Sequence, residues 1–332
     1  MFWQSHLGPL VGGGRRAFPP LALALQGGGA YGAFTWGVLD RLLEEDDVLP
    51  AAISGASAGA VNAVVTAWGL LEGGREGARA ALRKLWTDVG KMSLFSPLGS
   101  PGADLQFDLL TRLVSPYQFN PLNLNPLRDI LANTVDFDRL RREGQVSLFI
   151  SATDVSTGEP RVFRENEMTI DVMMASTCLP HIYQAVEIDG RSYWDGGITG
   201  NPPILPMVLE TPCRSLLVVR LTPQEEPAPP TAASEIASRL RRILFNASLQ
   251  RDMVAVEEMR QLLRRSNLLS SDLRRLRDLS VRVITIDQGF FSSNNGSALG
   301  ARPELLERLH SAGRQAAECL MEGAPSAAAQ PA

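Results

Sequence analysis

One serine in the sequence stands in a setting that suits nucleophilic chemistry. Ser57 is the centre of a Gly-x-Ser-x-Gly pattern that begins at Gly55 and ends at Gly59. A short apolar run, 51–54, precedes this pattern, and small and apolar residues, 60–70, follow it. A strand, a sharp turn and a helix in that order would hold the serine oxygen out into a pocket, with the positive end of the helix dipole directed at the same point. The pattern therefore predicts attack of Ser57 on an acyl carbon, with the two glycines allowing strand and helix to approach closely.

A run of glycines follows another apolar segment, 21–25. Gly27, Gly29 and Gly32 match the Gly-x-Gly-x-x-Gly pattern that cradles phosphate in dinucleotide-binding folds. That fingerprint also requires an acidic residue at the end of the second strand to hold the ribose. Here the second strand candidate ends in Ser54-Gly55 and leads into the serine turn, so the dinucleotide interpretation is incomplete.

An oxyanion hole is the interpretation of this glycine run that the neighbouring serine turn favours. The backbone amides of Gly27, Gly28 and Gly29 would point at the negative oxygen of a tetrahedral intermediate, which is a large source of transition-state stabilisation in acyl transfer. A glycine turn with only a structural role is the remaining alternative.

The base that would take the Ser57 proton has few histidine candidates. The chain has three: His6 in the N-terminal segment, His310 in an amphipathic pattern where we expect the surface of a helix, and His181 directly after a Leu-Pro pair. We regard His181 as the competing base. Asp195 is favoured over it, because aromatic residues and glycines surround it, and a partly desolvated carboxylate is more basic.

The Asp195 pattern, Tyr-Trp-Asp-Gly-Gly at 193–197, allows a second interpretation. Asp-Gly-Gly, here with Gly196 and Gly197, is commonly just a turn. The lack of a well-placed histidine is what favours a catalytic carboxylate that hydrogen-bonds directly to Ser57.

The elements that must position these residues are expected from apolar runs and helical spacing. The helical patterns are 34–43, 60–70, 232–267 and 304–317, and the strand candidates are 21–25, 51–54, 146–152, 161–163, 215–222 and 281–286. Several strands are continuous in Val, Ile and Leu, as expected for strands buried on both faces. The order predicts an α/β fold with a mostly parallel sheet covered by helices.

Two segments differ in character from the rest. The segment 90–125 mixes prolines with aromatic residues and leucines, which predicts a lid or a wall of the acyl pocket. The segment 232–267 is amphipathic and rich in arginine, which predicts one or two surface helices. Its outer face is either simply solvated or turned toward anionic lipid headgroups.

Composition limits the classes of partner. The chain has 332 residues, 45% of them hydrophobic and 20% charged, with a formal net charge of −4. This balance is that of an ordinary globular protein and gives no reason to expect nucleic acid. Cys178, Cys213 and Cys319 lie far apart with no metal-ligand spacing, so neither a disulfide framework nor a metal site is expected.

The chain is expected to form one catalytic domain, 21–322, with flexible ends. Residues 1–20 lack an apolar stretch long enough for a signal peptide or a membrane span, and 323–332 are rich in Ala, Pro and Ser. We therefore expect a cytoplasmic protein, and any contact that it makes with membranes is expected to be peripheral. Its oligomeric state is not indicated by the sequence.

With these motifs placed, the chain resembles the patatin-like phospholipase family from about residue 21 to 206. The resemblance includes Asp154 at the end of Ser-Ala-Thr-Asp and the block Ala-Ser-Thr-Cys-Leu-Pro that ends at Pro180. It implies a three-layer α/β/α sandwich with a mostly parallel central sheet. It also implies that Ser57 and Asp195 form a catalytic dyad, that Gly27, Gly28 and Gly29 supply the oxyanion hole, and that Pro180 shapes the pocket wall.

The resemblance implies an enzyme that hydrolyses a lipid or another ester through an acyl-enzyme, with no metal and no organic cofactor. Tyr31 stands where many family members carry Arg or Lys, so a preference for charged phospholipids is not implied. Three alternatives stay open: transfer of the acyl group to an alcohol, nucleotide binding without catalysis, and lipid binding without catalysis.

Overall fold

A mixed β-sheet forms the centre of the protein. The computed structural model describes residues 20–94, 114–223, 228–266, 270–287 and 301–322. Among these residues, eight strands form one sheet in the order β5-β6-β3-β2-β1-β7-β8, and β4 pairs with β3. The strands are β1 (Leu21–Leu25), β2 (Pro50–Gly55), β3 (Ser147–Asp154), β4 (Pro160–Arg164), β5 (Val186–Ile188), β6 (Arg191–Asp195), β7 (Ser215–Arg220) and β8 (Ser280–Thr285).

The five strands β3, β2, β1, β7 and β8 run parallel to one another. All five match the strands expected from apolar runs to within two residues at either end. The antiparallel hairpin of β5 and β6 was not predicted. Its turn, Asp189-Gly190, has φ of 51° and 74°, the left-handed pair that a two-residue hairpin turn requires. Its strands are short and half-exposed, so they carry little apolar periodicity.

Helices cover both faces of the sheet. They are α1 (Gly32–Leu42), α2 (Ala58–Leu94), α4 (Pro116–Phe119), α5 (Pro126–Ala132), α6 (Phe137–Glu143), α7 (Ile170–Ser176), α8 (Ile204–Glu210), α9 (Ala233–Arg264), α10 (Ser271–Arg277) and α12 (Pro303–Met321). Gly73 and Gly74 have non-helical backbone angles, so α2 is two helices joined by a kink. The arginine-rich segment forms the single long helix α9.

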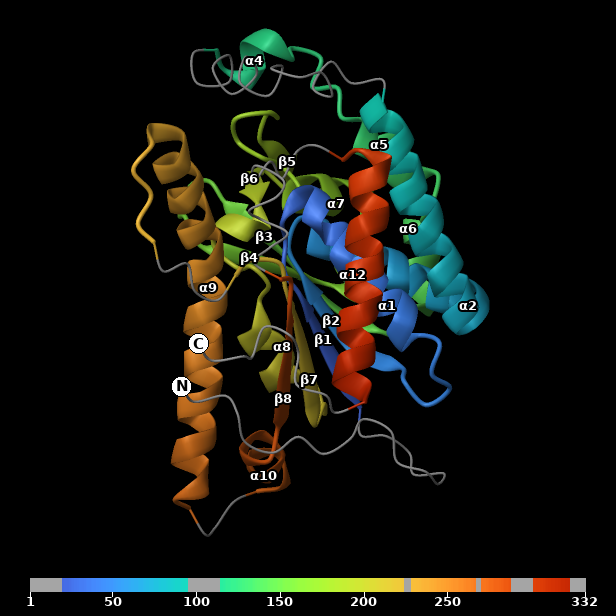
Figure 1. The fold of residues 1–332 in the computed structure, drawn as a ribbon, viewed down its shortest axis with the longest axis vertical. Coiled ribbons are helices and arrows are strands. Elements are labelled where there is room, and N and C mark those ends of the chain that lie inside the picture. Colours follow the sequence, from blue (N-terminus) through green and yellow to red (C-terminus); the bar gives the residue numbers. More distant parts are fainter. Residues whose placement is uncertain (1–19, 95–113, 224–227, 267–269, 288–300, 323–332) are drawn as a thin grey trace.

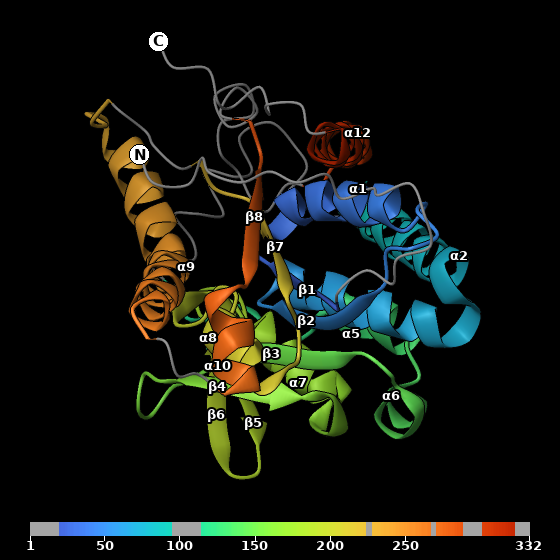
Figure 2. The same ribbon diagram turned by 90° about the horizontal axis from the view of Figure 1, so that it is seen from below.

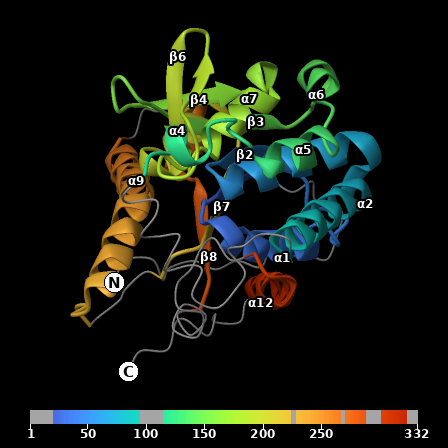
Figure 3. The same ribbon diagram turned by 90° about the horizontal axis from the view of Figure 1, so that it is seen from above.

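Two cores separate the layers. A larger core lies between the sheet and α1, α2, α7 and α12, and a smaller one lies between the sheet and α8, α9 and α10. Figures 1 and 2 show the sheet between these two groups of helices. The three-layer α/β/α fold is thus confirmed. Figure 3, seen from above, shows α4 over the same end of the molecule as the β5-β6 hairpin.

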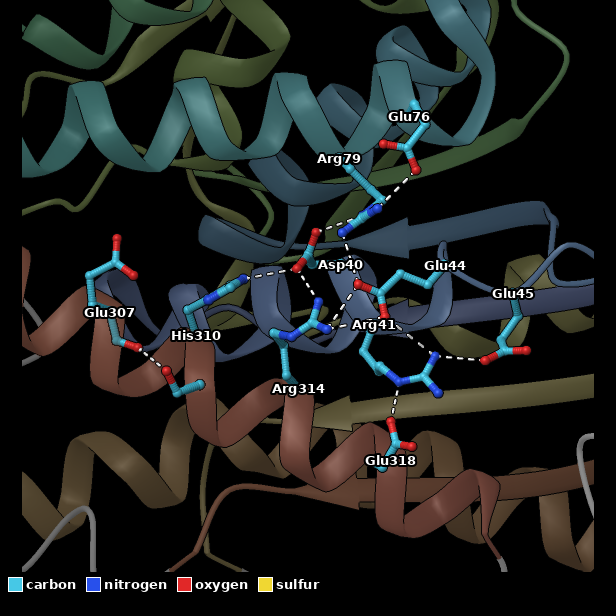
Figure 4. A network of polar contacts seen from close by, with 11 residues as sticks. Asp40, Arg41, Glu44, Glu45, Glu76, Arg79, Glu307, His310, Arg314 and Glu318 are labelled. Atoms are coloured by element: carbon cyan, nitrogen blue, oxygen red, sulfur yellow. Dashed lines mark hydrogen bonds and ion pairs between the residues drawn. The ribbon is translucent and has the colours of Figure 1, made fainter.

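A polar network fixes the C-terminal helix α12 to α1, as Figure 4 shows. Asp40 of α1 is almost fully buried and accepts hydrogen bonds from Arg79 Nε at 2.8 Å and from Arg314. His310 Nε2 lies 3.2 Å from the same carboxylate, and its ring centroid is 3.9 Å from that of Trp36. His310 therefore faces α1, and the expectation that it lies on a helix surface was wrong. A 3.6-residue pattern does not show which neighbour a polar residue meets.

Two glycines let α1 and α12 cross at backbone contact. A Cβ atom on Gly37 would lie 2.0 Å from the carbonyl oxygen of His310, and one on Gly313 would lie 2.0 Å from that of Phe34. Because α1 begins directly after the glycine run at 27–29, this crossing fixes the helix that follows the run.

We predict that Gly313→Ala lowers the free energy of unfolding by about 1–3 kcal/mol, because the added methyl group meets backbone that yields only if the helices separate. This is the net change: the steric cost outweighs the gain of about 1 kcal/mol that alanine brings to a helix interior. Urea denaturation followed by circular dichroism measures the change. Gln315→Ala, at an exposed position of the same helix, is the control and should leave stability nearly unchanged. Equal stability of Gly313→Ala and wild type would contradict the close crossing.

Candidate active site

Ser57 lies on a strained turn between a strand and a helix. β2 ends at Gly55, α2 begins at Ala58, and Ser57 has φ of 52°, in the left-handed region that few residues other than glycine adopt. A Cβ atom on Gly59 would lie 2.0 Å from the carbonyl oxygen of Leu25, and one on Gly55 would lie 2.6 Å from that of Gly59. Strain of this kind persists where the surrounding structure enforces it, which is typical of functional positions.

Asp195 is a carboxylate with no exposure to solvent at the end of β6. Gly197 N–H donates to its Oδ1 at 2.7 Å. Burial raises the pKa of Asp195 to about 7, against the opposing effects of the Ser57 hydroxyl and the Gly197 amide. No hydrogen bond of standard geometry reaches Oδ2 within the described residues. The Ser57 hydroxyl lies close enough to lower the pKa of Asp195, although it makes no hydrogen bond of standard geometry to Oδ2.

Strand β3 brings the serine and the carboxylate together. Gly55 at the end of β2 is paired with Ile150 of β3, and Asp195 is paired with Ala152, two residues further along the same strand. Thr153 Oγ1 of β3 also donates to the carbonyl oxygen of Asp195 at 2.8 Å. Two residues 138 positions apart in the chain are therefore held by one strand.

The glycine run packs directly against Ser57. A Cβ atom on Gly27 would lie 2.9 Å from the Cβ atom of Ser57. However, Gly27 N–H donates to Asn201 Oδ1 at 2.6 Å, so this amide is not available to an oxyanion. Gly27 was expected to be a donor; in this structure its N–H is bonded to Asn201 and its backbone lies close to Ser57. The amides of Gly28 and Gly29 have no hydrogen-bond partner within the described part of the chain.

Two polar residues position these loops and were not assigned a role from the sequence. Asn201 accepts from Gly27 and donates through Nδ2 to the Phe245 carbonyl of α9 at 3.0 Å. Ser176, at the end of α7, accepts from Ser57 N–H at 3.2 Å. Ser176 belongs to the Ala-Ser-Thr-Cys-Leu-Pro block, and Asn201 follows the Asp-Gly-Gly by four residues. Their hydrogen-bond partners are 119 and 174 residues distant in sequence.

The other residues of the predicted site serve close packing. A Cβ atom on Gly196 would lie 2.1 Å from the Ser151 carbonyl oxygen, and one on Gly197 would lie 2.5 Å from the Phe245 ring. Gly32 likewise has Ala58 Cβ within 2.8 Å of the position that its own Cβ would take. Pro180 is half-buried in the turn between α7 and β5.

His181 and Asp154 lie in settings unlike that of Asp195. His181 is exposed in the turn after Pro180, and it makes no hydrogen bond with any part of the chain that the structure describes. Asp154 accepts from Ser156 Oγ at 2.6 Å, from Arg191 Nη1 at 2.9 Å and from Ser156 N–H at 2.8 Å. These bonds hold the pKa of Asp154 well below its usual range. The carboxylate therefore fastens the turn that follows β3 to β6.

A cavity of about 270 Å³ lies beside the site. Asn123 and Asn125 line it, so part of the predicted pocket segment 90–125 does border a cavity, whereas 95–113 lie outside the described residues. Neither Ser57, Asp195 nor Pro180 lines it. Its connection to the site is Cys178, which lines the cavity and whose carbonyl oxygen accepts from Asp195 N–H at 2.8 Å.

The described residues contain neither a membrane-spanning helix nor a cluster of metal ligands. None of their helices has the length and apolar character needed to cross a membrane. Within the same residues, no group of three His, Cys, Asp or Glu side chains is arranged to hold a metal ion.

Comparison with known proteins identifies the class to which this fold and site belong. The chain is a member of the patatin-like phospholipase family, whose family model matches residues 23–208. This span includes the glycine run, Ser57 and Asp195. Among curated proteins, the chain is 28% identical over 239 residues to YjjU, an uncharacterized protein of Escherichia coli strain K12. The match covers 71% of this chain and 60% of YjjU, so the chain spans less than two thirds of that relative.

Two solved structures have similar folds. VipD from Legionella pneumophila is 15% identical with a TM-score of 0.48, covering 92% of this chain and 67% of VipD. ExoU, in its complex with SpcU from the type III secretion system of Pseudomonas aeruginosa, is 17% identical with a TM-score of 0.40, covering 92% and 52%. Similarity at this level adds nothing to what the family match and the site geometry show.

We predict that Asp195→Asn stabilises the fold at alkaline pH. The pKa of Asp195 is about 7 in the folded protein and about 3.9 in an unfolded chain, so folding favours its protonated form. The cost of burying the charge is absent below about pH 4, grows as pH rises, and is complete above about pH 7. At pH 8 the variant should gain a few kcal/mol, at about 1.4 kcal/mol per pKa unit.

Urea denaturation of wild type and Asp195→Asn across this pH range measures the effect. Asp154→Asn is the matched control, because the pKa of Asp154 is lowered and its charge is partnered. That control should instead lose stability at neutral pH. An Asp195→Asn variant without a pH-dependent gain would contradict a raised pKa at this position.

Proposed function

We propose that this protein is a serine lipid acyl hydrolase that cleaves carboxylic ester bonds. The observation that carries the proposal is the pairing of Ser57, held at φ of 52° after a strand, with the fully buried carboxylate of Asp195. Membership of the patatin-like phospholipase family makes lipids the substrate class. Both residues fall inside the family match. With Asp195 as the base, the mechanism requires no histidine.

Asp195 acts as the general base in this mechanism. Its carboxylate removes the Oγ proton of Ser57 while Oγ attacks the ester carbonyl carbon. A base is most effective when its pKa lies near the working pH, and burial places the pKa of Asp195 at about 7. The protonated Asp195 then returns the proton to the departing alcohol, leaving the fatty acyl group esterified to Ser57.

The amides of Gly28 and Gly29 stabilise the oxyanion, with the N-terminus of α2 contributing its dipole. Each such donor supplies about 3 kcal/mol in the transition state. Gly27 stands against Ser57 and is anchored by Asn201, so the loop lies against the serine rather than open as a phosphate cradle would be. This contact favours the oxyanion hole over the dinucleotide alternative.

Deacylation uses the same groups in reverse. Asp195 removes a proton from water, the hydroxide attacks the acyl carbon, and Ser57 leaves with the proton from Asp195. Tyr31, where many relatives carry a cation, is buried, and burial raises the pKa of its hydroxyl. Tyr31 itself therefore brings no positive charge to the glycine run, and we expect no requirement for a charged lipid headgroup.

The dyad is tested by hydrolysis of a medium-chain p-nitrophenyl ester. We expect Ser57→Ala to lower kcat/KM at least about 1,000-fold and Asp195→Asn about 100- to 10,000-fold. His181→Ala should stay within about twofold of wild type, since its side chain is exposed and makes no hydrogen bond to the described residues. Circular dichroism checks that each variant is folded. Loss of activity in His181→Ala with full activity in Asp195→Asn would overturn the proposed mechanism.

The pH dependence of kcat/KM tests the protonation state of the base. Because Asp195 must be ionised to accept the serine proton, activity should fall about tenfold per pH unit below about pH 7. The profile is measured in His181→Ala, so that titration of His181, the competing base, cannot produce the acid limb. A rate that stays constant down to pH 5 would exclude a base with this raised pKa.

A further inference from the structure

The outward face of α9 is apolar where a surface helix is normally polar. Ile236, Leu240, Ile243 and Leu244 follow helical spacing and are 49–56% exposed. The opposite face of the same helix packs on the sheet through residues such as Leu249, which is 2% exposed. The helix is therefore apolar on two sides, and only one of them is explained by the fold.

Positive charge accompanies this exposed face. The segment 233–251 contains four arginines and one glutamate, a formal +3 in a chain whose net charge is −4. Arg241 and Arg251 are exposed, whereas Arg239 and Arg242 are half-buried and donate to the Ala228 carbonyl and to Ser238 Oγ. An apolar stripe with arginines beside it is the pattern of helices that lie in the interface of a bilayer. Each arginine near anionic lipid contributes about 1 kcal/mol to binding.

This face lies at the end of the molecule that carries the dyad. α9 begins beside the carboxyl ends of the parallel strands, where Ser57 lies, and runs down to α10 at the opposite end (Figure 1). The α4 region lies at the same end as the start of α9, and it exposes Leu122 and Leu124 at 78% and 67%. Exposed apolar side chains thus occur on two elements at this end.

We propose that the N-terminal half of α9, with the exposed leucines after α4, docks on the surface of an anionic lipid bilayer. The exposed Arg241 and Arg251 match anionic headgroups, whereas they would repel their counterparts in a symmetric contact between two copies of this helix. The benefit of docking at this end rests on the proposed function, since a lipid leaving the bilayer would enter beside Ser57. The docking itself does not depend on catalysis.

Vesicle co-sedimentation of Ser57→Ala tests the proposal without hydrolysis of the vesicles. The vesicles are phosphatidylcholine with and without an equal amount of phosphatidylglycerol. We expect binding to the anionic vesicles, weakened by salt. Adding Leu240→Glu and Ile243→Glu should weaken partitioning at least about tenfold, since two apolar side chains leave the interface. Arg241→Gln should weaken it about fivefold on anionic vesicles only.

The matched control is Leu262→Glu, which places the same charge at a 65% exposed leucine at the other end of α9. The Leu262→Glu variant should bind vesicles as well as the Ser57→Ala parent does. Both it and the Leu240→Glu/Ile243→Glu variant should have the melting temperature of the parent. With Ser57 restored, Leu240→Glu/Ile243→Glu should hydrolyse a soluble short-chain ester at the wild-type rate, which separates failure of docking from failure of catalysis.

Three outcomes would overturn the proposal. In the first, the parent Ser57→Ala does not bind anionic vesicles. In the second, the variant with Leu240→Glu and Ile243→Glu binds them as well as the variant with Leu262→Glu does. In the third, sedimentation velocity without lipid shows a dimer that the double substitution abolishes, so that a second copy covers this face.

Discussion

The charge of Asp195 is held where water does not reach it, and much of the surrounding structure follows from that constraint. A buried carboxylate resists ionisation, which is why its pKa rises to about 7, and at neutral pH the fold must tolerate it partly charged. Only Gly197 N–H bonds it with standard geometry among the described residues. The parallel strands on one side and the helices on the other supply the apolar burial that offsets this penalty. The same desolvation that weakens the fold also raises the basicity of the carboxylate.

Keeping water out requires the loops around the carboxylate to pack at backbone distance, which explains where the glycines fall. Gly27 contacts Ser57, Gly59 contacts the end of β1, and Gly196 contacts β3, each at a distance that leaves no room for a Cβ atom. Asn201 and Ser176 then satisfy the amides of Gly27 and Ser57 that this packing removes from water. The loops around Asp195 are therefore closely packed, and the amides of Gly28 and Gly29 have no hydrogen-bond partner among the described residues.

Local sequence signals predicted the elements but not the contacts between them. The parallel strands were visible because both of their faces are buried, and Ser57 was visible because a strained turn between strand and helix demands small neighbours. The β5-β6 hairpin escaped because its strands are short and half-exposed. The contacts of Asn201 and His310 could not be predicted, because their partners, Gly27 and Asp40, are 174 and 270 residues away in the sequence. Nothing in the neighbouring residues distinguishes a side chain that will meet a distant backbone amide from one that will meet solvent.

Elements outside the family match complete the site. The match ends at residue 208, yet α12 fixes α1, which begins just after the glycine run, and α9 holds Asn201 and packs Phe245 against Gly197. One helix, α9, thus braces the loop beside Asp195 with its inner face and presents apolar residues with its outer face. A force that shifts α9 relative to the sheet would move the Phe245 carbonyl and hence Asn201, which positions the glycine loop. Under the proposed docking, a shift of α9 would reach the glycine loop through Asn201, which bonds the Phe245 carbonyl and Ser248 Oγ, and through the contact of Asn246 with Gln26.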